Sequence, residues 1–192
     1  MAEELLENLN RLKLIPRTGW LLCGIPLGEV EDVAQHTFDV VAMTLVLSEE
    51  LSLENVDLSR ALAMAVVHDW PEALIGDIPY PAKKHFRGEW KGSAEESALN
   101  ELVRGLRSSR KYVELWREYR EGKTVEAKLV HMADYLSIMV QALKYRERGN
   151  SSKELDELWR AVQKDIAPYL HEFPGSAEMV RKMNRRFGTR RG

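Results

Sequence analysis

The stretch ALAMAVVHDWPEALIGDIP, residues 61–79, begins as an apolar run and turns abruptly polar at His68 and Asp69. The run has the length and composition of a buried helix, and it extends back to about residue 58. Pro71 cannot lie deep inside a helix, so it predicts a break followed by a restart in the first turn of a new helix. Polar side chains are costly to desolvate at the end of a buried segment, so something must stabilise them there.

The rest of the chain also has apolar residues at helical spacing, and we find no sustained alternating pattern typical of strands. Loops are expected at residues 17–29 and 76–84, which are rich in glycine and proline. Further helices are predicted from residue 5 to before Pro16 and at 31–50, 93–106, 110–121, 124–148, 151–169 and 176–186. Expected caps are Asp57 or Ser59, Ser93, Thr124 and Ser151. The sequence therefore predicts an all-α helical bundle.

Length and composition indicate one globular domain spanning residues 1–192. Helices within 151–187 are expected to pack on its core or at a dimer interface. Hydrophobic residues make up 44% and charged residues 30% of the chain, and its net charge is −2. This balance gives no general attraction to nucleic acid or to an anionic membrane. We interpret the basic segment 181–192 as a helix end and a solvated tail.

Cellular location is indicated by what the sequence lacks. Cys23 is the only cysteine, so an internal disulfide is excluded and a reducing compartment is favoured. The N-terminal residues contain early acids and no apolar core of a signal peptide. No apolar stretch reaches the roughly 18 residues that a membrane span needs. We therefore expect a cytoplasmic protein with no membrane partner.

Two further polar residues lie on apolar helices, as the pair at 68 and 69 does. His36 is surrounded by valines in the predicted helix 31–50, and Asp134 lies in the most apolar part of the helix 124–148. Two imidazoles and two carboxylates form a mixed nitrogen and oxygen site, which favours Mn, Co, Fe or Zn over Mg. Such a site leaves coordination positions open, as in catalytic centres.

Each of these residues also has an ordinary structural interpretation. A single buried histidine such as His36 is more often a hydrogen-bonded core residue than a ligand. Asp134 could pair with a buried arginine or lysine, and Glu72 and Asp77 could be solvated or capping carboxylates. The joint pattern of His, His-Asp and Asp, each on an apolar helix, is much more specific than any single member.

That pattern resembles the H…HD…D signature of the HD-domain metal-dependent phosphohydrolases. Four blocks resemble one branch, the 5′-deoxynucleotidases, and they are RLKLIPRTGW (11–20), EDVAQHTF (31–38), HDWPEALIGDIP (68–79) and TVEAKLVHMADYL (124–136). The resemblance covers roughly residues 5–145, which it implies to be the core of the domain. Gln35 stands where an acid is usual, and His131 stands where a lysine is common. Neither position is an expected ligand.

The resemblance implies hydrolysis of deoxyribonucleoside 5′-monophosphates to deoxynucleoside and phosphate by a homodimeric enzyme. The residues that it assigns are the metal ligands His36, His68, Asp69 and Asp134, the catalytic acids Glu72 and Asp77, and the substrate-facing Arg17 and Trp20. Glu72 is expected to protonate the leaving oxygen or to position water. Asp77 is expected to orient either the nucleophile or the groups that surround the metal ligands. Arg17 would bind phosphate, and Trp20 would leave no room for a 2′-hydroxyl. Without the resemblance, Arg17 is equally a surface cation and Trp20 a core aromatic.

Three alternatives remain open from the sequence. The same metal site could serve a cyclic-nucleotide phosphodiesterase or a nucleoside triphosphate hydrolase. A non-catalytic HD module that senses a nucleotide is another class, although the presence of both Glu72 and Asp77 argues against it.

An exposed apolar face suited to a dimer contact is expected at Leu155, Leu158 and Trp159.

Overall fold

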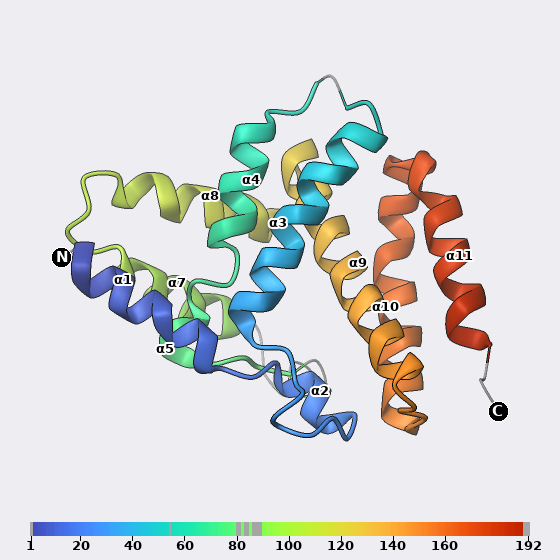
Figure 1. Cartoon of the computed structure of the whole chain (residues 1–192). Coiled ribbons are helices and arrows are strands. Elements are labelled where there is room, and N and C mark those ends of the chain that lie inside the picture. Colours follow the sequence, from blue (N-terminus) through green and yellow to red (C-terminus); the bar gives the residue numbers. More distant parts are fainter. Residues whose placement is uncertain (1, 54, 80–81, 83–84, 86–89, 190–192) are drawn as a thin grey trace.

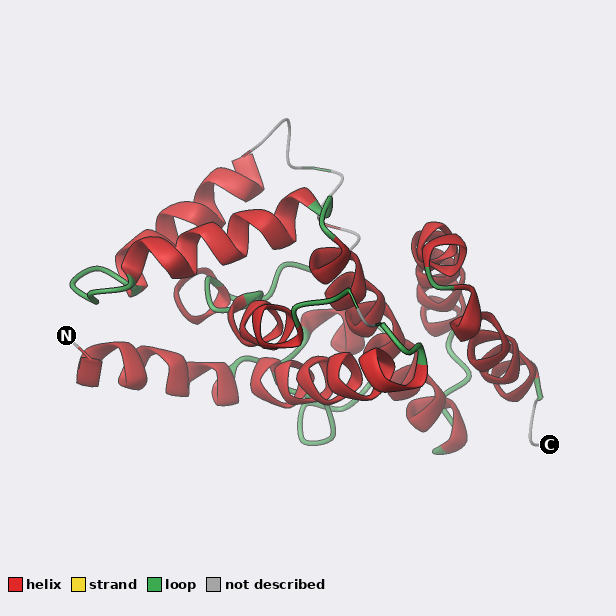
Figure 2. Ribbon diagram, turned by 90° about the horizontal axis from the view of Figure 1, so that it is seen from above, coloured by secondary structure: helices red, strands yellow, loops and turns green. Residues whose placement is uncertain are grey.

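The computed structural model describes residues 2–53, 55–79, 82, 85 and 90–189 of the chain. Within these ranges the ordered elements are helices, with only an isolated bridge between Pro16 and Asp32 (Figure 2). The all-α prediction is therefore confirmed. The expected loop at 76–84 lies partly outside the described ranges, as does the end of the basic tail. The assignment of the whole chain to one domain stays a prediction.

Three contacting helices form the centre of the molecule: α3 (Val33–Glu50), α4 (Leu58–Val67) and α9 (Val125–Glu147) (Figure 1). Buried residues occur along almost the whole of α9, so it serves as the central helix. The described helices include none long and apolar enough to cross a membrane. His36, His68 and Asp134 come from or directly follow these three central elements.

The remaining elements cover two sides of this centre (Figure 1). On one side lie α1 (Ala2–Asn10), η1 (Arg11–Leu14), α5 (Glu72–Ile75), α7 (Trp90–Leu102) and α8 (Ser109–Glu121). On the other side, α10 (Lys153–Glu172) and α11 (Ala177–Gly188) pack on α9 and are joined by η2 (Pro174–Ser176). Each side has its own cluster of buried apolar residues.

Local sequence signals determine several helix ends. The Asp57 carboxylate accepts from the backbone N–H of Arg60 at 3.0 Å, so Asp57, and not Ser59, caps α4. Thr124 caps α9 by accepting from the N–H of Ala127 at 3.2 Å, as expected. Each cap satisfies a backbone donor that the helix itself leaves unpaired.

Other boundaries differ from the prediction. The segment 17–29 is not only loop, because Thr18–Leu22 forms the short helix α2. Ser93 lies inside α7, which begins at Trp90, so it is not a cap. Helix α10 is capped by Ser152, whose hydroxyl accepts from the Leu155 N–H at 3.2 Å, and not by Ser151.

The expected dimer face on α10 is wrong. Leu155 and Trp159 are buried, and the indole of Trp159 stacks on Phe187 of α11 with ring centroids 3.9 Å apart. Leu158 is half-buried. The apolar face of α10 is therefore used within the chain, against α9 and α11. On α3, by contrast, the large apolar side chain of Phe38 is 71% exposed.

Candidate metal centre

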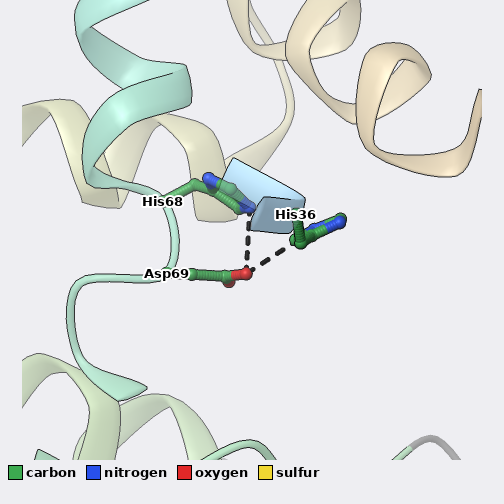
Figure 3. A group of neighbouring side chains, drawn as sticks. All are labelled: His36, His68 and Asp69. Carbon is green, nitrogen blue, oxygen red and sulfur yellow. Dashed lines mark ion pairs between the residues drawn. The ribbon is translucent and has the colours of Figure 1, made fainter. Parts of the chain in front are cut away.

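Three polar side chains meet where α3 passes the end of α4 (Figure 3). His36, His68 and Asp69 each offer one ligand atom, and these atoms lie within 4.8 Å of one another. Oδ2 of Asp69 is 3.1 Å from Nε2 of His68 and 3.7 Å from Nε2 of His36. Helix α4 ends at Val67, so His68 and Asp69 lie in a turn. There they can face one point, whereas on a regular helix they would diverge by about 100°.

Asp134 of α9 adjoins this group without being a member of it. Its Oδ1 lies 3.1 Å from Nε2 of His36, and its Oδ2 accepts a hydrogen bond from the Tyr119 hydroxyl at 3.1 Å. The side chain is therefore held against His36 by a residue of α8. The structure thus places the four predicted ligands in one neighbourhood, three of them as a compact group.

The donor atoms in this neighbourhood fit a cation. Among the described residues, the buried polar atoms without a hydrogen-bond partner include Nε2 of His36, Nε2 of His68 and Oδ1 of Asp134. Nε2 of His36 and Oδ1 of Asp134 face each other at 3.1 Å, and Nε2 of His68 faces Asp69 at the same distance, but none of the three makes a hydrogen bond. A buried polar atom without a hydrogen bond costs about 1–3 kcal/mol, so three together need an explanation. Imidazole nitrogens beside carboxylates are a ligand set for divalent first-row metals. A bound cation would satisfy all three atoms at once.

Groups behind the two histidines orient their rings. Nδ1 of His68 lies 2.7 Å from the carbonyl oxygen of Ala65, which can only accept. Nδ1 therefore carries the proton, and the lone pair of Nε2 faces the group of three. Nδ1 of His36 lies 3.1 Å from the Ser137 hydroxyl and 3.4 Å from a carboxylate oxygen of Glu31. Both rings thus present Nε2 to the same point.

Glu31 is itself held in place. It is 6% exposed, and its second oxygen accepts from the indole N–H of Trp20 at 3.0 Å. Its backbone N–H donates to the Tyr145 hydroxyl at 2.9 Å. A buried carboxylate behind a ligating imidazole is a recurring arrangement of metal sites, where it fixes the ring and raises its basicity.

The charges of the centre perturb one another. Burial raises the pKa of Asp69, but His68, Arg17 and His36 outweigh it and hold that pKa well below its usual range. Burial and Arg17 lower the pKa of His36, but the carboxylates of Asp134 and Glu31 outweigh them and raise it to about 9. The centre therefore attracts positive charge strongly.

Arg17 and Asp77 form a second group beside the first. The Arg17 guanidinium lies 3.3 Å from Oδ1 of Asp77 and 3.5 Å from Oδ2 of Asp69. Asp77 also accepts from the Thr18 backbone N–H at 2.6 Å and from the Thr18 hydroxyl. Asp77 thus anchors the start of α2 and holds the cation of Arg17 toward Asp69.

These residues line a cavity of about 330 Å³. Its walls include all but one of the eight predicted site residues, namely Arg17, Trp20, His68, Asp69, Glu72, Asp77 and Asp134. The exception, His36, lies behind the wall with 1% of its side chain exposed. The cavity therefore joins the candidate ligands, the two acids and the arginine in one space.

Several residues of the centre were not anticipated from the sequence. The sequence assigned no role in this centre to Glu31 or to Thr18. Tyr119 carried no signal, because its partner Asp134 lies on another helix. Glu31 offers one hint in the sequence, which is its charge five positions before the ligand candidate His36.

Comparison with known proteins agrees with this geometry. A model of the family described as HD domain matches residues 9–173. The 5′-deoxynucleotidase HDDC2 of Bos taurus is 31% identical over 81% of this chain and 73% of its own length. The 5′-deoxynucleotidase hdd1 of Schizosaccharomyces pombe is 30% identical over 79% and 76%. A conserved hypothetical protein from Pyrococcus furiosus superposes with a TM-score of 0.75 at 36% identity, covering 94% of this chain and 98% of that one.

Proposed function

Because this chain belongs to the HD domain family, we propose that it is a metal-dependent 5′-deoxynucleotidase, which hydrolyses deoxyribonucleoside 5′-monophosphates to deoxynucleoside and phosphate. The observation that carries the proposal is the convergence of unpaired Nε2 atoms of His36 and His68 on Asp69 and Asp134 beside a cavity. The same cavity holds an arginine suited to phosphate and two further acids.

The four residues His36, His68, Asp69 and Asp134 would hold one divalent cation. When bound, it supplies positive charge that polarises a phosphoryl oxygen and lowers the pKa of water. The mixed donor set favours Mn, Co, Fe or Zn over Mg. Glu31, Ala65 and Tyr119 support the proposal, because their contacts hold the ligands in the required orientation before a cation arrives.

Arg17 is the proposed phosphate-binding residue. Its guanidinium lines the cavity and is held by Asp69 and Asp77 on one side, which leaves other donors of its fork for phosphate oxygens. Asp77 then acts through Arg17 and Thr18 as a positioning residue. Of the two roles expected for Asp77, these contacts favour support of the groups around the metal ligands over direct orientation of the nucleophile.

Glu72 is the proposed acid for the leaving 5′-oxygen. It begins α5 directly after Pro71, it is buried, and its Oε2 has no hydrogen-bond partner among the described residues. Burial and the carboxylates of Asp69 and Asp77 raise its pKa well above the ordinary value. A carboxyl that stays protonated near neutral pH can donate a proton to a leaving alkoxide.

Trp20 is the proposed wall against a 2′-hydroxyl. Its ring is 3% exposed, borders the cavity and is held through its N–H by Glu31. The ring also makes a T-shaped contact with the ring of Tyr145, with their centroids 5.1 Å apart. A ring held in this way cannot move aside for a larger sugar, which supports selection of deoxyribose by exclusion.

The proposal predicts a defined pattern of substrates. The protein stripped with chelator should release no phosphate, and Co²⁺ or Mn²⁺ should restore release from dAMP. Release from dAMP should exceed that from AMP at least about tenfold, because a clash penalises the ribonucleotide. Phosphate release is followed with dAMP, AMP, 3′-dAMP and dATP under each metal.

Other outcomes of that assay select the alternatives. Turnover of dATP or of cyclic nucleotides in place of dAMP would replace the deoxynucleotidase by a triphosphohydrolase or a phosphodiesterase. Bound metal and bound dAMP without any turnover would indicate a sensing module. The homodimer and the cytoplasmic location stay predictions, which size-exclusion chromatography with light scattering and cell fractionation would test.

Arg17→Ala should weaken phosphate recognition. Loss of its charge-assisted hydrogen bonds should lower kcat/KM for dAMP by about 10- to 100-fold. Because the contact is to the phosphate, inhibition by inorganic phosphate should weaken in parallel. Arg11→Ala is the matched control, since Arg11 is exposed on η1. Unchanged phosphate inhibition in Arg17→Ala would remove Arg17 from phosphate binding.

A further inference from the structure

One face of α10 borders the same cavity as the candidate metal centre. Leu158, Ala161, Val162 and Asp165 are spaced by three, four and seven residues, so they share a side of the helix, and all of them line the cavity. The helix lies against α9, where Ile138 also lines the cavity, one turn from Asp134. One turn is a rise of about 6 Å, which is within the length of a nucleoside.

Another part of the cavity wall, on α7 and α8, is differently built. On α7 the carboxylate of Glu95 is buried and paired with Lys91 at 2.8 Å and with Arg120 of α8 at 2.6 Å. Nearby, Trp116 is buried and donates its indole N–H to the carbonyl oxygen of His68 at 3.2 Å. This wall offers paired charges and the indole of Trp116. The wall of α9 and α10 offers the aliphatic side chains of Ile138, Leu158, Ala161 and Val162, beside His131 and Tyr135 of α9. The faces of a nucleobase are apolar, so they fit the wall of α9 and α10.

Asp165 adds a polar group to the aliphatic wall. It is half-buried, and it makes no hydrogen bond or ion pair with any other residue that the structure describes. Its carboxylate can only accept at neutral pH, and a deoxynucleoside offers donors at its 3′-hydroxyl and at base amino groups. Apolar walls with a few placed polar groups are typical of small-molecule sites.

We infer that the α10 wall, defined as Ile138, Leu158, Ala161, Val162 and Asp165, binds the nucleoside half of the substrate. The inference rests on the proposed function and assigns the two ends of the substrate to different elements. The phosphate lies at Arg17 and the candidate metal centre. The sugar and base lie on α10, with Asp165 accepting a hydrogen bond from the nucleoside. Helix α10 therefore contributes to the active site in addition to packing on α9.

A bulky side chain on the α10 wall should impair binding of the nucleoside but not of the phosphate. Ala161→Trp should raise KM for dAMP at least about tenfold and weaken competitive inhibition by deoxyadenosine to the same extent. Inhibition by inorganic phosphate should stay within about twofold, because phosphate does not reach the wall. Ala167→Trp is the matched control, because Ala167 is exposed on the same helix. It should behave as the wild type.

A second variant guards against misfolding of the first. Asp165→Ala favours the helix and removes only the carboxylate. It should weaken deoxyadenosine inhibition about fivefold, the effect of one lost hydrogen bond. An unchanged KM for dAMP in Ala161→Trp, or equal weakening of phosphate and deoxyadenosine in both variants, would overturn the inference.

Failure of the proposed function has a different signature. In that case the wild-type protein would hydrolyse no deoxynucleotide, and binding of deoxyadenosine would be measured by calorimetry. Binding that Ala161→Trp abolishes and Ala167→Trp retains would leave the α10 wall as a nucleoside site on a protein with another activity. Absence of deoxyadenosine binding to the wild type would reject the wall as well.

Discussion

His68→Ala is expected to abolish metal binding and phosphate release together. Nε2 of His68 is one of the unpaired buried atoms of the centre and lies 3.1 Å from Oδ2 of Asp69. Loss of a partner behind a ligand costs roughly 10- to 100-fold in metal affinity or activity, so loss of the ligand itself should cost more. Metal content after dialysis is measured by mass spectrometry, and phosphate release from dAMP is measured on the same sample.

The control for this variant lies in the same chain. His171 is exposed near the end of α10, and His171→Ala should keep both metal and activity. Circular dichroism checks that both variants are folded, because the ring of His68 is buried and also contacts His36 and Tyr119. A His68→Ala protein that retains one equivalent of metal and wild-type turnover would place the metal centre elsewhere.

The sequence predicted the helices well where local signals decide them. Asp57 and Thr124 precede apolar runs and act as caps, and Pro71 separates α4 from α5 as expected. Helix α2 could not be predicted in this way. Its first residue, Thr18, is anchored by Asp77, which lies 59 residues further along the chain. Tertiary hydrogen bonds can stabilise a short helix in a segment rich in glycine and proline.

Burial was less predictable than helicity. Several neighbouring positions of α3 are apolar, so periodicity alone does not say which stripe faces α9. The buried stripe runs through Val33, His36 and Val40, and it leaves Phe38 exposed. On α10 the apolar residues Leu155 and Trp159 are covered by packing that only the fold reveals.

In the candidate site too, some residues could be predicted from the sequence and others depend on the fold. Residues whose type is unusual for their position, such as His36 and Asp134 on apolar helices, could be found from the sequence. Residues that act through contacts between helices, such as Glu31 behind His36 and Tyr119 beside Asp134, could not. The residues that α10 contributes to the α10 wall lie outside the part of the chain that the resemblance covers, so only their position beside the cavity indicates a role.

The sharpest test of the proposed chemistry is Glu72→Gln. Glutamine keeps the shape of the side chain but cannot deliver a proton to the leaving oxygen. Loss of a positioned general acid lowers kcat by about 10²- to 10⁴-fold. KM and metal content should remain near wild type, because Glu72 is not a proposed ligand. Glu101→Gln, an exposed site on α7, is the matched control.

Two further measurements distinguish a proton donor from a residue that only positions water. A phosphate ester with a good leaving group, such as p-nitrophenyl phosphate, needs no proton on departure, so Glu72→Gln should impair its hydrolysis far less than that of dAMP. Burial and neighbouring carboxylates raise the pKa of Glu72, so the acid stays protonated to a higher pH than usual. Wild-type kcat should therefore fall as pH rises through that pKa, and the fall should be absent in the variant. Equal losses on both esters would instead make Glu72 the residue that orients water, because attack at phosphorus is common to both reactions.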